Sequence, residues 1–292
     1  MANGIMVIDK PAGWTSMDVC AKLRGVLHER RIGHGGTLDP MATGVLPVFV
    51  GRATRAVEFA SESEKEYIAE LKLGVITNTQ DTTGEVVEER PVTADRDQVL
   101  AVLDRFRGDI FQIPPMYSAI KIGGKKLYEL ARKGKEVERA PRPVRIHALE
   151  LLASAGPADH RLRVRCSKGT YVRTLCHDIG EALGCGGCMG ALRRTMAAGF
   201  ALDDAVPLEA VQAAADRGEA ETLLLPVDAY FTGRSDLVLK PEAEKKLRNG
   251  MTLVIPSLPE GEYRVYGGDG TFLALCRAER GKLITVKSFF PV

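Results

Sequence analysis

Strand-like and helix-like segments alternate irregularly along the 292 residues, and this order constrains the fold more than any other feature. Apolar or alternating runs typical of strands occupy 4–8, 45–50, 67–73, 144–152 and 161–166. Caps and helical spacing predict helices over 16–28, 95–106, 170–183 and 207–216. A short helix is also predicted over 125–132, and 85–88, after the Thr83-Gly84 turn, is predicted to form a hairpin with 67–73. The segments follow no regular strand–helix–strand rhythm, and the chain has neither a GxGxxG fingerprint nor a P-loop. The pattern therefore favours an α+β fold over a doubly wound nucleotide-binding fold.

A domain boundary is expected near Thr232–Ser235, where an acidic stretch ends. It divides the chain into residues 1–234 and 235–292. Beyond it, a short helix over Pro241–Asn249 and several short strands separated by Gly or Pro predict a small β-rich module.

Membrane and secreted classes are disfavoured by the sequence. No apolar run approaches the ~18–20 residues of a membrane span, and the N-terminus lacks the zones of a signal peptide. We therefore expect a cytoplasmic protein whose six cysteines are thiols rather than a disulfide framework.

Charge is segregated along the chain although its total is only +2. The segment Lys121–Arg145 carries nine Lys or Arg and three Glu, whereas Glu62–Asp109 carries twelve acids and six bases. Two interpretations of the basic segment stand side by side. It is either a solvated helix with flexible flanks or an arm that contacts the phosphates of a nucleic acid.

A glycine-rich loop over Arg30–Gly44 is the strongest candidate for chemistry. Glycines surround His34, and Asp39 is followed by Pro40. Glycines let backbone approach a ligand closely, and the proline keeps Asp39 out of the helical region. The result is a carboxylate on a rigid loop, which suits a nucleophile or base. An ordinary Asp-Pro turn is the competing interpretation.

Two other patterns in the sequence predict no site. Cys185 and Cys188 have CxxC spacing, with Cys176 and His177 upstream, but no second paired motif accompanies them, so we predict no metal. Acidic pairs at 88–89 and 203–204 lie in solvated stretches, and they do not support a two-carboxylate glycosidase.

Six blocks of sequence resemble the motifs of one family, in that family's order. Gly33–Gly44 resembles the signature G-H-x-G-x-L-D-P-x-A-x-G of the TruB family of tRNA pseudouridine synthases. The other blocks resemble its D-K-P-x-G-x-T-S, K-x-Y, P-P-x-Y-S-A-x-K, G-T-Y-[IV]-R and L-R-R-T motifs, and they occupy 9–16, 65–67, 114–121, 169–173 and 192–195. Together the blocks are highly specific.

The resemblance implies a pseudouridine synthase catalytic fold over 1–234, with a mixed, mainly antiparallel sheet flanked by helices. It implies an RNA-gripping insertion at about 114–145 and a PUA-like RNA-binding domain over 235–292. The implied activity converts uridine to pseudouridine at position 55 in the T-loop of tRNA, by base flipping and without a cofactor. The implied enzyme is the stand-alone bacterial type, a monomer that needs no protein partner or guide RNA.

The resemblance also assigns roles to individual residues. Asp39 matches the catalytic aspartate. Other matches fall on residues that bind the substrate, which are His34, Tyr67, Tyr171, Arg173 and Leu192. Lys10 and Pro11 match residues that brace the active-site loop. The basic segment falls where the family has its insertion, so the resemblance makes it an RNA-contacting arm; its members are Lys121, Lys125, Lys126, Arg132 and Lys133.

Two alternatives remain beside the interpretation as a stand-alone tRNA-uridine isomerase. One is a tRNA-folding factor that binds without catalysis. The other is the catalytic subunit of a guide-RNA-dependent particle, since such subunits resemble the family too. Activity on bare tRNA transcript separates them from a stand-alone isomerase.

Overall fold

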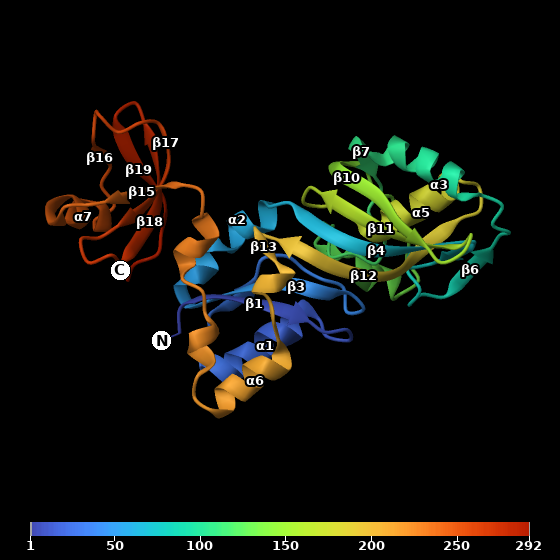
Figure 1. Ribbon diagram of the computed structural model, residues 1–292, viewed down its shortest axis with the longest axis horizontal. Helices are drawn as coiled ribbons and strands as arrows, with labels where there is room; N and C mark the ends of the chain where they lie inside the picture. The colour runs from blue at the N-terminus through green and yellow to red at the C-terminus, as the bar shows by residue number, and fades with distance from the viewer. Residues whose placement is uncertain (1, 292) are drawn as a thin grey trace.

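A computed structural model describes residues 2–291 as an elongated molecule built around two sheets (Figure 1). The larger sheet has ten strands. In spatial order it runs β14 (Val206–Pro207), β1 (Gly4–Lys10), β3 (Thr43–Val50), β12 (Gly187–Ala197), β4 (Lys65–Leu73), β11 (Asp159–Cys166), β10 (Arg142–Ser154) and β7 (Gly108–Gln112), with β2 (Ile32–His34) on β3 and β13 (Phe200–Ala201) on β12. Only the pairs β1–β14 and β3–β12 are parallel. The sheet is therefore mixed and mainly antiparallel, as predicted.

Helices cover the two halves of this sheet through separate cores. Around β1 and β3, α1 (Ser16–Leu27) and α6 (Leu208–Asp216) pack through residues such as Leu23, Leu46 and Val211. Around β4 and its neighbours, α3 (Arg96–Leu103) and α5 (Val172–Ala182) share a second core, which also contains Tyr67 and Leu192. Capping boxes begin α1 at Thr15 and α3 at Asp95. The sequence predicts the box at Asp95, and for α1 it predicts a cap at Thr15 or Ser16.

The smaller sheet has five strands, in the order β15 (Ser235–Val238), β17 (Gly261–Tyr266), β18 (Phe272–Glu279), β19 (Lys282–Ser288) and β16 (Leu253–Val254). Together with α7 (Pro241–Arg248) it forms the β-rich module expected at the C-terminal end, although β15 had no counterpart in the prediction. The sheet lies at one end of the molecule (Figure 1).

An aromatic cluster joins the small sheet to the body. Phe231 ends a 3-10 turn that precedes β15, and its ring centroid lies 5.9 Å from Phe272 and 5.6 Å from Phe289. Phe49 on β3 and Phe231 belong to the same buried core as Phe289. Arg55, in a 3-10 turn that runs into α2 (Val57–Glu62), donates hydrogen bonds to Ser288 of β19. The two sheets thus share one hydrophobic core.

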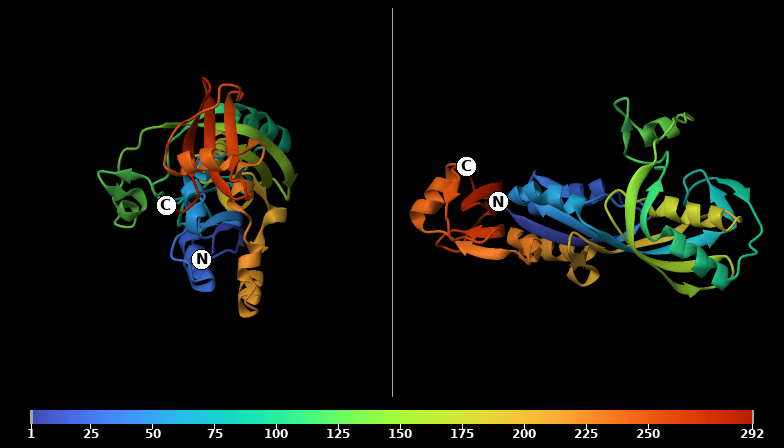
Figure 2. Two further views of the ribbon diagram at one scale, coloured as in Figure 1. Left: turned by 90° about the vertical axis from the view of Figure 1, so that its left-hand side faces the viewer. Right: turned by 90° about the horizontal axis from the view of Figure 1, so that it is seen from above.

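An arm projects from the body between β7 and β10 (Figure 2). It holds a small hairpin of β8 (Lys121–Ile122) and β9 (Lys125–Lys126), followed by α4 (Leu127–Ala131). The predicted helix over 125–132 was wrong at its start, because residues 125 and 126 pair with the preceding strand. The reason is the Gly123–Gly124 turn, where both residues have positive φ and reverse the chain.

Two further expectations were wrong. The segment Arg30–Gly44 is not all loop, since Ile32–His34 pairs with β3. The strand expected to form a hairpin with 67–73 is β6 (Val86–Glu89), and it pairs with β5 (Val75–Thr77) instead. Both edges of β4 are occupied by β11 and β12, and Gly74, at φ +85°, ends β4.

Gly44 gives a stability prediction. A Cβ at this position would lie 2.2 Å from the main-chain oxygen of Arg194, and its φ is +103°. We expect Gly44→Ala to lower the free energy of unfolding by more than about 3 kcal/mol, because strain and overlap with backbone add. Urea unfolding measures the change. Gly25→Ala in α1 is the matched control, since a Cβ there meets nothing within 4 Å. That control is expected to stabilise by up to about 1 kcal/mol, and equal effects of the two changes would contradict the prediction.

Among the described residues, no helix is long and apolar enough to cross a membrane. All six cysteines are free and buried, as thiols, in agreement with the sequence prediction.

Candidate active site

The loop that carries Asp39 is held from both sides by hydrogen bonds. Ser16, at the start of α1, accepts a hydrogen bond from the Leu38 amide at 2.9 Å and donates one to the Leu38 carbonyl at 3.3 Å. The Pro40 carbonyl accepts from the Gly13 amide at 2.8 Å. The main chain on each side of Asp39 is therefore fixed to the α1 end of the molecule.

Lys10 extends this support from the end of β1. Its side chain is fully buried, and its Nζ donates to the carbonyls of Pro11, Trp14 and Pro40 at 2.9, 2.7 and 3.2 Å. Burial lowers the pKa of Lys10 to about 8, while the nearby Asp39 carboxylate acts in the opposite direction. Lys10 thus contacts the loop that the resemblance says it braces, and the Pro11 carbonyl is bound by Lys10.

Arg194 on β12 holds the earlier part of the loop. Only 1% of this side chain is exposed. Its Nε donates to the Val45 carbonyl at 2.7 Å, and its two terminal nitrogens donate to Thr37 and Gly36 at 3.2 and 3.1 Å. Burial lowers the pKa of Arg194 from its ordinary value. Arg194 lies in the L-R-R-T block, but no role is predicted for it from the sequence. Local sequence does not distinguish a buried arginine from a surface arginine.

Asp39 and Arg173 form an ion pair at the centre of the site. The Nε of Arg173 lies 2.9 Å from a carboxylate oxygen of Asp39. The Asp39 side chain is 37% exposed, whereas that of Arg173 is 7% exposed. Asp39 is therefore accessible to a substrate, while its partner is fixed from behind. The remaining donors of Arg173 bond to the carbonyls of Thr79 and Tyr117 at 3.1 and 3.0 Å.

A second carboxylate, Asp81, stands behind the pair and was missed by sequence reasoning. It is 4% exposed and lies 3.6 Å from the Arg173 Nε. Its other oxygen accepts hydrogen bonds from the side chain of Thr79 and from the amide of Thr83. The run Thr79–Gly84 has the composition of an ordinary turn. Only the tertiary contact with Arg173 distinguishes Asp81 from other turn aspartates.

Two tyrosines lie near Asp39. Tyr67 on β4 is 9% exposed, and Tyr171 directly precedes α5. Burial raises the pKa of both phenols, and the charge of the nearby Asp39 acts in the same direction on each. Leu192, 8% exposed, belongs to the same core cluster as Tyr67 and Leu38. The structure thus gathers Tyr67, Tyr171, Arg173 and Leu192 around the Asp39 loop.

His34 lies on the short strand β2, opposite Val48 of β3. Its Nδ1 accepts a hydrogen bond from the Gly36 amide at 3.4 Å. Burial lowers the pKa of the imidazole, so His34 is neutral near pH 7. This side chain therefore contributes shape and hydrogen bonding to the loop rather than charge.

The predicted basic residues belong to the arm that projects from the body (Figure 2). Lys121, Lys125 and Lys133 are exposed. The other two flank one aromatic ring: the charged groups of Lys126 and Arg132 lie 5.4 and 5.3 Å from the centre of Tyr128. Arg139 closes the base of the arm by donating to the Pro114 carbonyl at 3.1 Å.

A metal centre has no support in the described part of the chain. Within residues 2–291, no group of three or more His, Cys, Asp or Glu side chains is placed to hold an ion. Cys185 and Cys188 are both buried, and burial raises the pKa of both thiols. Cys185 and Cys188 are therefore buried residues that pack in the protein interior.

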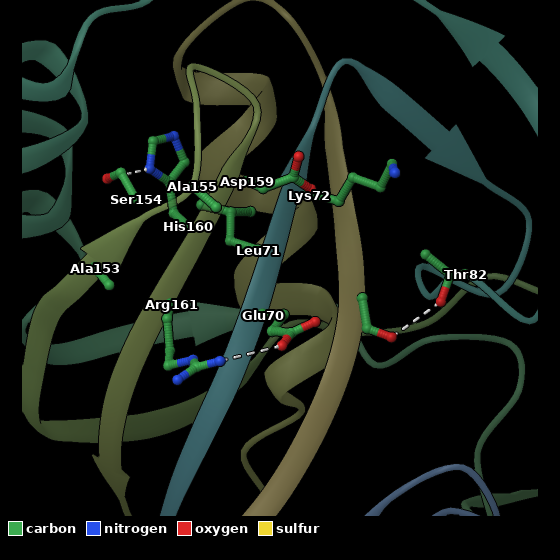
Figure 3. A pocket seen from close by; sticks show the side chains of 11 residues that line it. Glu70, Leu71, Lys72, Thr82, Ala153, Ser154, Ala155, Asp159, His160 and Arg161 are labelled. Carbon is green, nitrogen blue, oxygen red and sulfur yellow. Dashed lines mark hydrogen bonds and ion pairs between the residues drawn. The ribbon is translucent and has the colours of Figure 1, made fainter.

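A cavity of about 540 Å³ lies elsewhere, beside β4, β11 and the end of β10 (Figure 3). Glu70, Lys72, Asp159 and Arg161 line it with charges of both signs, and Thr82 donates to the Gly190 carbonyl at its rim. None of the predicted site residues lines this cavity. The candidate site is therefore the clamped Asp39 loop and not this cavity.

Comparison with known proteins places the chain in a family. A family model described as "TruB family pseudouridylate synthase (N terminal domain)" matches residues 24–172, slightly more than half of the chain. The chain belongs to the TruB family of pseudouridylate synthases. A second model, the tRNA pseudouridylate synthase B C-terminal domain, matches residues 173–232. The TruB resemblance drawn from the six sequence blocks is confirmed.

Relatives named tRNA pseudouridine synthase B match almost the whole chain. The protein from Ralstonia nicotianae is 46% identical over 273 residues, which cover 92% of this chain and 87% of the relative. The protein from Azoarcus sp. is 45% identical over 284 residues, covering 97% and 93%. The similarity therefore extends through most of both sheets.

Solved structures share the TruB fold as well. A chain of a Cbf5–Nop10–Gar1 complex matches with a TM-score of 0.75 and 26% identity, over 99% of this chain and 86% of that one. A chain of an H/ACA ribonucleoprotein bound to a substrate RNA matches with a TM-score of 0.74 and 25% identity, over 99% and 85%. The predicted pseudouridine synthase fold, with its β-rich C-terminal part, is confirmed.

Proposed function

We propose that this TruB-family protein isomerises uridine to pseudouridine at position 55 in the T-loop of tRNA. The observation that carries the proposal is the accessible Asp39 carboxylate, held on a clamped loop 2.9 Å from the Arg173 guanidinium. The relatives named tRNA pseudouridine synthase B support tRNA as the substrate. The solvent-exposed basic arm supports contact with a folded RNA.

The reaction requires that one nucleotide leave its stack, because a base inside a folded loop cannot be reached in place. In our proposal Tyr67 stacks on the flipped uracil, which is worth ~1–3 kcal/mol, and Tyr171 and Leu192 line its other sides. His34 helps to hold the displaced nucleotides. Asp39 acts at the sugar or the base while the uracil leaves C1′, turns and rejoins through C5. The C5 proton passes to solvent and N1 gains a proton, so the isomerisation balances without redox chemistry or a cofactor.

We assign RNA binding to the arm and to the C-terminal module, in addition to the catalytic domain. Residues 1–234 form the catalytic domain, and the arm at about 114–145 grips the T-stem-loop. Residues 235–292 form a PUA-like domain that binds the same tRNA. The protein acts in the cytoplasm as a monomer, without a protein partner or a guide RNA.

The arm gives a prediction about salt. Lys125→Glu/Lys126→Glu is expected to weaken tRNA binding and to flatten the dependence of log Kd on log salt by roughly 1 for each lost phosphate contact. Titrations at several salt concentrations measure both effects. Arg96→Glu/Arg105→Glu is the matched control, because α3 and the 3-10 turn Asp104–Phe106 that follows it lie on the other side of the body from the arm (Figure 2). An unchanged slope in the arm variant would remove these lysines from the RNA interface.

Tritium release from tRNA that carries 5-tritiated uridine tests the proposed function, because rejoining through C5 must expel the label. We expect release from bare transcript by the purified protein alone, and none from a transcript with cytidine at position 55. Binding without release would indicate a tRNA-folding factor. Release only after a guide RNA or a partner protein is added would indicate the particle subunit instead.

A further inference from the structure

Gln112, the last residue of β7, makes an unusual contact with Tyr171. Its side-chain oxygen accepts a hydrogen bond from the Tyr171 amide at 3.0 Å, and its side-chain nitrogen donates to the Tyr171 carbonyl at 3.2 Å. The residues are 59 positions apart. Both hydrogen-bonding groups of one residue's main chain are thus bound by one side chain, and the Tyr171 carbonyl also accepts from the Leu175 amide at 3.0 Å.

The geometry of Tyr171 explains why a glutamine fits. Tyr171 is extended, with φ −101° and ψ 107°, and an extended residue presents its N–H and C=O on the same side. A primary amide offers one acceptor and a donor on the same plane. Gln112 therefore takes the place of a neighbouring strand. It is 2% exposed, so water cannot readily replace either hydrogen bond.

This contact fixes the beginning of α5, which has no side-chain cap of its own at Tyr171. The first turn of α5 carries Arg173, the partner of Asp39. Without Gln112, the Tyr171 amide would be left unsatisfied next to the site, at a cost in free energy unless the backbone moved. The Tyr171 carbonyl would keep only its hydrogen bond from the Leu175 amide of α5, at 3.0 Å. Moving that backbone would shift the Tyr171 ring and the Arg173 guanidinium together.

Gln112 also joins the site to the arm. The arm begins at the next residue, and its Tyr117 carbonyl accepts a hydrogen bond from Arg173 at 3.0 Å. The strand end at Gln112 is thus the common base of the arm and of the α5 terminus.

We propose that Gln112 is a positioning residue, which sets Tyr171 and Arg173 relative to Asp39 through its paired hydrogen bonds to Tyr171. This inference rests on the proposed function. It predicts that loss of the contact impairs the chemical step while leaving tRNA binding intact, because affinity for tRNA comes mainly from phosphate contacts of the arm rather than from the exact placement of Tyr171 and Arg173.

Two variants test the proposal in the full-length protein. Gln112→Met keeps most of the side-chain volume and removes both hydrogen bonds. Gln112→Glu keeps the acceptor for the Tyr171 amide but has a donor for the Tyr171 carbonyl only when its carboxyl group is protonated. Burial raises the pKa of such a carboxyl, so lowering the pH restores the missing donor.

We expect single-turnover tritium release by both variants at pH 8 to be about 10- to 100-fold slower than wild type, the effect of a small misplacement of reacting groups. The Kd for tRNA is expected to stay at its wild-type value. The ratio of the Gln112→Glu rate to the wild-type rate is expected to rise as the pH falls to about 5.5, whereas the Gln112→Met ratio stays flat. Gln98→Glu, the same change on an exposed residue of α3, controls for the added charge.

Wild-type rates in both variants would overturn the proposal. A loss that appears equally in Kd, or that follows the fraction of unfolded protein measured by circular dichroism at each pH, would also overturn it, since it would show a general structural role. Absence of release by the wild-type protein would instead refute the proposed function itself, so the two failures are distinguishable.

Discussion

Asp39→Asn is expected to reduce tritium release by at least roughly 10³-fold, because the amide can neither act as a nucleophile nor accept a proton at neutral pH. The substitution keeps the size and shape of the side chain. Since the loop is held by main-chain contacts to Leu38 and Pro40, its conformation does not depend on the Asp39 carboxylate. The variant is therefore expected to bind tRNA with wild-type affinity and to unfold at the wild-type urea concentration.

The measurement is single-turnover release at saturating enzyme, with Kd from filter binding. Asp203→Asn is the matched control, because Asp203 is an exposed aspartate in a 3-10 turn far along the chain. Turnover by Asp39→Asn at a rate close to the control would refute the catalytic assignment. A large loss of binding together with turnover would show that Asp39 holds the substrate rather than transforms it.

Arg173→Met is expected to impair both catalysis and stability. Its guanidinium contacts Asp39 and lies 3.6 Å from Asp81, which is buried. Removing the cation leaves the Asp81 carboxylate without its ion pair, at an expected cost of about 3 kcal/mol in the free energy of unfolding. It also frees Asp39 to rotate, and we expect turnover to fall by about 10²–10³-fold.

Urea unfolding and single-turnover release measure these two effects separately. Arg193→Met is the matched control, since Arg193 is the neighbour of Arg194 on β12 and forms an ion pair with Asp9 at 2.8 Å, with 42% of its side chain exposed. A surface ion pair of this kind contributes at most about 1 kcal/mol. Comparable losses in the two arginine variants would show that Arg173 has no special place in the site.

Local signals in the sequence were enough to predict many of the elements. Some signals lie within a single segment and can be recognised from sequence alone. They include the caps at Thr15 and Asp95 and the alternation along 67–73. The glycine-rich loop and its aspartate were found for the same reason. The assignment of Asp39 to the catalytic role came from the family resemblance, because an Asp-Pro pair alone is equally typical of a turn.

Long-range contacts explain what the sequence did not predict. Asp81, Gln112 and Arg194 acquire their places only when distant strands meet, and each looks like an ordinary residue in its own segment. The hairpin of β5 and β6 was misassigned because pairing depends on which strand edges are already occupied. The arm helix was misplaced because two glycines reverse the chain, and helical spacing does not detect a turn.

The aromatic cluster around Phe231 has a consequence for how the molecule meets a large substrate. Phe272 and Phe289 from the small sheet pack on Phe231 in the same core as Phe49, so a change in the spacing of the two sheets would have to disrupt this buried packing. The shared core therefore holds the small sheet at a set distance from the Asp39 loop. If the proposed function holds, a tRNA that contacts both the small sheet and the Asp39 loop must have a shape that spans this distance.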